Sequence, residues 1–103
     1  MPEMTFTVRW PDGREDECYS PSLVVHDHLT EGTSYAVAEF VDRAVVALEL
    51  AEERVRVAYG FACSSARATR DSIRSTATAF AGDERVELVR MHPGLPAEVR
   101  GGA

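Results

Sequence analysis

Thiol, phenol, hydroxyl and imidazole groups are concentrated in residues 18–28, CYSPSLVVHDH. His26 and His28 have the spacing that places both rings on one face of a strand, where two imidazoles can ligate one metal ion. Cys18 or Cys63 could complete such a set of ligands. Two histidines on the surface of a loop would have the same spacing, and on balance we expect no metal site and no bound cofactor.

The second cysteine, Cys63, falls where a helix is expected to begin, and the unpaired N–H groups at such a position activate a thiol. With His26 as a base, it could act as a nucleophile. The alternative is a small buried residue between a helix and a loop, which is common for free cysteine. No phosphate-binding glycine loop, zinc-protease motif or nucleophile elbow is present in the sequence, so we assign no catalytic residue.

Two further groups of residues could form a binding site. Tyr59 and Phe61 flank Gly60, a residue typical of the left-handed end of a helix. The two rings either contact each other across the helix end or form an exposed corner for a partner. Ser20 and Ser22 lie on either side of a proline, which is typical of a turn, although their hydroxyls could also bind an anion.

The strands that must position these groups follow from alternation of apolar and polar residues. Residues 4–10 alternate in this way, and the Pro-Asp-Gly turn after them predicts an antiparallel return over 14–20. Residues 22–29 form a third short strand or an ordered loop. Residues 85–91 form a closing strand, which we expect to pair beside the first.

Apolar residues spaced by three and four predict a helix over 37–59 and a weaker one over about 64–80. The element order predicts an α+β fold: a small antiparallel sheet, made of the hairpin and the C-terminal strand, with both helices packed on one face. We expect a single domain over residues 1–92. Residues 93–103 are rich in proline and glycine and are expected to form a disordered tail.

Composition excludes several classes of protein. The 103 residues are 45% hydrophobic and 27% charged, with a net charge of -6, which argues against binding to nucleic acid or to an anionic membrane. All the basic residues are arginine, so chemistry that needs a lysine is excluded. No signal peptide or apolar span is evident. We therefore expect a cytoplasmic protein with two reduced cysteines.

Three blocks of the sequence occur together in a known order: WPDG at 10–13, CYSPS at 18–22 and YGFAC at 59–63. In this they resemble the small nitrogen-starvation-response proteins of bacteria, over about residues 1–91. The resemblance implies a context: members are encoded beside a nitrilase-type carbon–nitrogen hydrolase, in clusters linked to growth on nitriles or cyanide. It implies no catalytic residue for this chain.

We therefore predict a non-catalytic accessory protein that binds another product of its gene cluster. It would form a homodimer, because sheet edges are exposed in so small a fold. Pro21 could bend the chain so that CYSPS meets the corner at 59–63. The predicted binding surface consists of Cys18, Tyr19, Ser20, Ser22, Tyr59, Phe61 and Cys63. The alternatives are a small-ligand or metal-binding module that uses Cys18 and Cys63, and a small cysteine-dependent enzyme.

Overall fold

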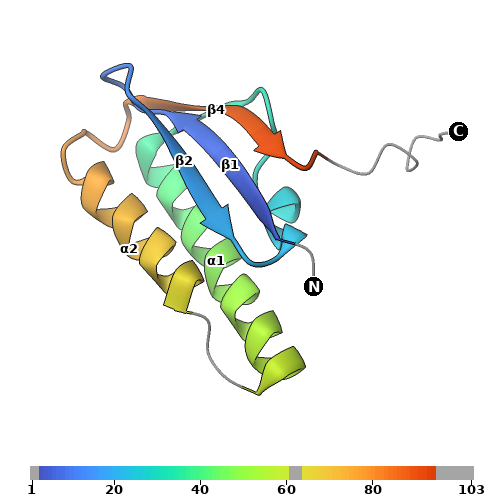
Figure 1. Ribbon diagram of the computed structural model, residues 1–103. Helices are drawn as coiled ribbons and strands as arrows, with labels where there is room; N and C mark the ends of the chain where they lie inside the picture. The colour runs from blue at the N-terminus through green and yellow to red at the C-terminus, as the bar shows by residue number, and fades with distance from the viewer. Residues whose placement is uncertain (1–2, 61–63, 95–103) are drawn as a thin grey trace, which may run out of the picture.

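The structure is a computed structural model that describes residues 3–60 and 64–94. Two helices cover one face of a four-stranded antiparallel sheet with the strand order β2-β1-β4-β3 (Figure 1). The strands are β1 (Met4–Arg9), β2 (Glu15–Ser20), β3 (Ser34–Ala36) and β4 (Arg85–His92). The helices are α1 (Val37–Tyr59) and α2 (Ser64–Ala77), with a short 3-10 helix, η1 (Leu23–Asp27). The predicted α+β fold is confirmed, including the last strand beside the first. Phe61, Cys63 and most of the predicted tail lie outside the described residues.

The β1–β2 hairpin forms at the predicted turn. The backbone N–H of Trp10 donates to the carbonyl of Arg14 at 2.8 Å, and the N–H of Arg14 donates to the side chain of Asp12 at 3.0 Å. Gly13 has a φ of 92°, which a residue with a side chain rarely adopts. Strand β1 therefore ends at Arg9, one residue before the expected end at Trp10.

Two short elements differ from the sequence-based expectation. The segment expected to be a third strand or an ordered loop is η1, whose first turn is capped by the Ser22 hydroxyl. Strand β3, which the sequence did not predict, has three residues, too few for alternation of apolar and polar residues to be recognised. Before β3 begins, the carboxylate of Glu31 accepts the backbone N–H of Met91 at 3.1 Å, in the part of β4 that extends beyond β3.

Trp10 is part of the core and is 2% exposed. Its ring stacks on Phe80 with centroids 5.7 Å apart, and it meets the edge of Phe40 at 5.6 Å. Its indole N–H donates to Asp16 at 2.9 Å, so the one polar atom of the ring has a partner. Helix α2 ends at Ala77 and not near Phe80 as expected, because the chain turns there and carries Phe80 over Trp10.

Ion pairs connect the exposed sides of the two helices. Arg67 of α2 binds Glu52 of α1, and Arg70 binds Glu49 at 3.4 Å. Within the described residues, no helix is both long and apolar enough to cross a membrane.

Candidate binding site on the open face of the sheet

The face of the sheet opposite the helices is not covered by any described helix or strand (Figure 1). Side chains alternate along a strand, so the residues of β1 that alternate with its core residues point to this face, together with their partners on β2 and β4. We call this surface the open face. It consists of three rows across β2, β1 and β4: Glu15, Arg9 and Glu87; Glu17, Thr7 and Arg90; and Tyr19, Thr5 and His92.

The charges of the first row form ion pairs with one another. The guanidinium of Arg9 donates to Glu15 at 2.7 Å and to Glu87 at 2.9 Å, so it links all three strands. Its hydrogen bond and attraction to Glu15 raise the pKa of Arg9 further, so the side chain stays charged. This row is a structural contact across the sheet and offers little to a ligand.

The middle row carries two charges that are not neutralised locally. Glu17 and Arg90 are exposed and lie on either side of Thr7, and neither forms an ion pair within the described part of the chain. Thr7 is 7% exposed although it points to the open face, because its neighbours cover it. A negative and a positive group are thus held two strands apart on one surface.

The third row forms a pocket of about 290 Å³. Its lining consists of Glu3, Met4, Thr5, Tyr19, His92 and Pro93. The Tyr19 hydroxyl donates to the carboxylate of Glu3 at 2.9 Å, which holds Glu3 at the rim. On the other side, a ring nitrogen of His26 lies 3.0 Å from the carbonyl of Pro93 and fixes that wall. The pocket combines an aromatic ring with a carboxylate, a hydroxyl and an imidazole.

Of the predicted residues in the CYSPS block, only Tyr19 reaches this surface. Ser20 and Ser22 are buried, and the Ser20 hydroxyl donates to the carbonyl of Ser22 at 2.8 Å. The Ser22 hydroxyl in turn accepts the backbone N–H of Val24 at 3.2 Å. Both hydroxyls therefore stabilise the bend into η1, where they are not available to an anion.

Cys18 points into the core between β2 and the helices and is 8% exposed. Burial raises the pKa of its thiol to about 12, with smaller contributions from the charges of Asp16 and Glu17. A thiol with so high a pKa stays protonated at neutral pH, and the protonated form is neither a nucleophile nor a good metal ligand. In the part of the chain that the structure describes, no three His, Cys, Asp or Glu side chains form a group that could hold a metal ion.

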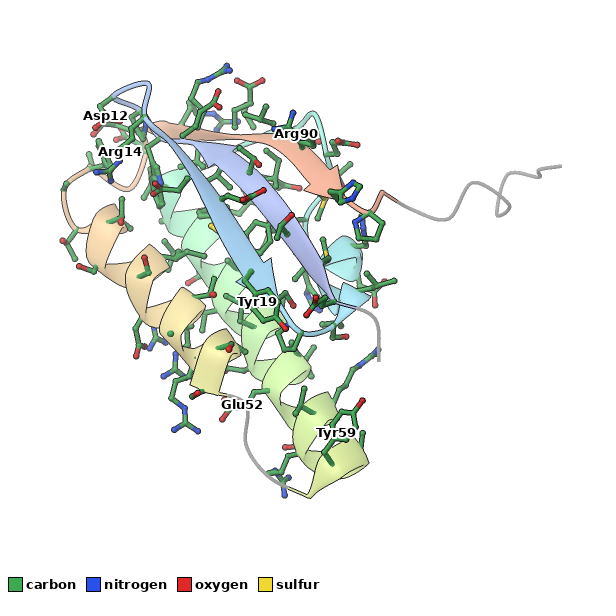
Figure 2. All side chains as sticks on the ribbon, viewed as in Figure 1. Asp12, Arg14, Tyr19, Glu52, Tyr59 and Arg90 are labelled. Carbon is green, nitrogen blue, oxygen red and sulfur yellow. The ribbon has the colours of Figure 1, made fainter. Side chains whose placement is uncertain are left out.

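Tyr59 lies far from this pocket, at the C-terminal end of α1, and is 54% exposed. Figure 2 shows Tyr19 on β2 and Tyr59 beyond the end of the sheet, well separated from each other. The structure therefore does not bring Tyr59 to the CYSPS block. The other two residues of the predicted corner, Phe61 and Cys63, lie outside the described residues.

The remaining residues of the open face, above all Arg90 and His92, were not predicted from the sequence. The signal for them was present in part, because the last strand was expected beside the first and its polar residues had to face away from the core. The pairing register between β1 and β4 could not be predicted from the sequence. Thr7 pairs with Arg90, but the next residue, Val8, pairs with Leu88, so Val89 is an extra residue in β4. Such a bulge shifts every later side chain relative to the simple alternation.

Comparison with known proteins identifies a family whose model matches this chain. The family model described as nitrogen starvation-induced protein NitG matches residues 5–91. No curated protein and no solved structure matched the chain.

Proposed function

This chain belongs to the family of nitrogen starvation-induced protein NitG, and we propose that it serves the response to nitrogen starvation as a non-catalytic accessory protein. In this proposal it is cytoplasmic and binds a protein encoded in the same gene cluster, one devoted to assimilating nitriles or cyanide. The open face of the sheet is its binding surface.

The observation that carries this proposal is the middle row of the open face. A charged group that is exposed and lacks a local partner can pair with an opposite charge on another molecule. Glu17 and Arg90 supply one such group of each sign, next to the aromatic ring of Tyr19. Aromatic residues and arginine are also the types most enriched where binding energy is concentrated in protein interfaces. The burial of the Cys18 thiol supports a role in which Cys18 is not a nucleophile.

The pocket of the third row favours a second candidate function, a small-ligand module. Its volume of about 290 Å³ is near the lower limit for pockets that hold small molecules. In that case the ligand would contact Tyr19, Thr5 and His92, and not Cys18 and Cys63, the residues that the sequence indicated for a small-ligand module.

Native mass spectrometry of the purified chain with each purified protein of its gene cluster tests the proposal. We expect one of those proteins to bind, and Arg90→Glu to weaken the complex about tenfold or more, because a rim charge is reversed. Arg74→Glu on α2 is the matched control, since it reverses a charge that is also exposed but lies on the helical side. If no cluster protein binds, or if both variants weaken binding equally, the proposal is wrong.

The same spectra distinguish the small-ligand module from the protein-binding accessory protein, and they test the predicted homodimer. A small ligand would add its mass to the chain alone, and Tyr19→Ala would remove that mass. The homodimer stays a prediction, which the mass of the chain without partners decides.

A further inference from the structure

Strand β2 is the outer strand on one side of the sheet, and its outer edge has no neighbouring strand in the described structure. It has six residues, contains no proline and pairs with β1 without a bulge. Proline, bulges and very short strands are the usual ways in which proteins block such an edge. The edge of β2 uses none of these three and is protected instead by charged side chains, which proteins also use for this purpose.

The pairing in the hairpin fixes which backbone groups of β2 face outward. The N–H of Trp10 donates to the carbonyl of Arg14, so Arg14 belongs to a hydrogen-bonded pair. In an antiparallel ladder, hydrogen-bonded and non-hydrogen-bonded pairs alternate. Asp16 therefore directs its backbone groups to β1, whereas Glu15 and Glu17 direct theirs to the outer edge.

The side chains along this edge are acidic, which decides what can pair with it. Glu15, Asp16 and Glu17 follow one another in β2. A second copy added antiparallel about Glu17 would place Glu17 opposite Glu17, and like charges directly opposite are destabilising. Glu15 is neutralised in part by Arg9, so Glu17 carries most of the unbalanced charge.

The other edge of the sheet is a poorer template. Strand β3 has three residues, and the guanidinium of Arg85 already donates to the carbonyl of Ser34 at 2.9 Å. Strand addition would therefore concentrate at β2.

We propose that the outer edge of β2 receives an extended, basic segment of a partner protein as a fifth strand of the sheet. This inference rests on the proposed function and names the element of the partner that binds. Backbone hydrogen bonds to Glu15 and Glu17 supply the affinity, as in other cases of strand addition. Arginine or lysine at alternate positions of the added strand would face the two carboxylates on the open face. The acidic edge would reject a second copy of this chain, so the predicted homodimer would have to form through another surface.

Hydrogen exchange measured by NMR on the full chain tests this inference. The probe is a synthetic peptide of the length of β2 that alternates arginine and threonine. We expect it to slow the exchange of the Glu15 and Glu17 amides about tenfold or more, because they become hydrogen-bonded, and to leave the Asp16 amide little changed. A peptide in which every backbone nitrogen is methylated keeps the charge but cannot form the ladder in either strand direction, so it should give no protection.

Variants provide the second arm of the experiment. Glu17→Arg should abolish the protection by the arginine peptide, and Glu17→Gln should weaken it. Asp42→Arg on α1 makes the same change of charge at an exposed position far from the edge, and should leave protection intact. Circular dichroism confirms that each variant is folded.

Each outcome decides the inference separately from the proposed function. If the peptide binds without protecting the two amides, or protects Glu17→Arg equally, strand addition is wrong even if a cluster protein binds. If the amides are protected but no cluster protein binds, the edge is a strand receptor and the proposed partner is wrong.

Discussion

The buried thiol of Cys18 should make the protein lose stability in alkali in a way that one substitution removes. Its pKa is raised by burial from 9.0 to about 12 in the folded chain, so the folded state holds this proton more tightly than the unfolded state does. Well below pH 9 the thiol is protonated in both the folded and the unfolded state, so its ionisation does not affect the free energy of unfolding. Between pH 9 and about 12 it ionises only in the unfolded chain, and unfolding becomes easier as the pH rises.

The size of the effect follows from the shift. Each pH unit in this window lowers the free energy of unfolding by up to about 1.4 kcal/mol. Over the whole window the loss is on the order of 4 kcal/mol, a large fraction of the stability of a small domain. Cys18 is 8% exposed, so solvent screens this penalty little.

Urea unfolding followed by the fluorescence of Trp10, the only tryptophan, measures the effect. The comparison is between the chain with Cys18 and Cys18→Ala, both in a Cys63→Ser background, so that other groups titrate equally in the two proteins. We expect the two free energies of unfolding to differ by a constant up to pH 9 and to converge or cross above it. Parallel curves up to pH 11 would refute the reasoning, as would a native Cys18 that reacts with a thiol reagent at pH 7 as fast as a free thiol.

Three further predictions concern the core, the hairpin and the end of α1. Trp10→Ala should lower the free energy of unfolding by about 3–5 kcal/mol, because Phe40 and Phe80 lose the ring between them, and Trp10→Phe should cost less; circular dichroism in urea measures both. Asp16→Ala should cost about 1 kcal/mol, because the buried indole N–H loses its acceptor, whereas Asp16→Asn keeps an oxygen there and should retain most of the stability; an equal loss in both would show that the hydrogen bond is not the cause. Gly60→Ala should cost about 1 kcal/mol in thermal unfolding, because the φ of 83° is strained for a side chain while no atom lies within 4 Å of the added Cβ, and a loss several times larger would contradict a purely backbone origin.

Local signals in the sequence were sufficient for the long elements. The helix predicted over 37–59 is α1 at those bounds, because a run of this length repeats its apolar spacing many times and ends at a glycine. The hairpin followed from a turn with one favourable conformation. Strand β3 could not be predicted, because three residues form a strand only through their pairing with β4.

The candidate site was less accessible, for two physical reasons. Alternation along β2 sends Cys18 and Tyr19 to opposite sides of the sheet, so neighbours in the sequence could not belong to one surface. Tyr59 follows the apolar spacing of α1 yet is exposed, because the spacing identifies a face of the helix and not how far the sheet extends along it. The pocket joins residues from both ends of the described chain, and their register depends on a bulge that the sequence does not mark.

The central position of β1 and β4 has a consequence for how the chain folds. These two strands are adjacent in the sheet but are separated in the sequence by both helices and by β2 and β3. Until β4 arrives, the β1–β2 hairpin exposes one side of β1 and has no continuous apolar layer for the helices to cover. Closing so long a loop has an entropic cost, and folds dominated by such distant pairings form slowly. A growing chain on the ribosome would therefore remain incompletely folded until β4 is synthesised, and it would reach its native state in one late, cooperative step.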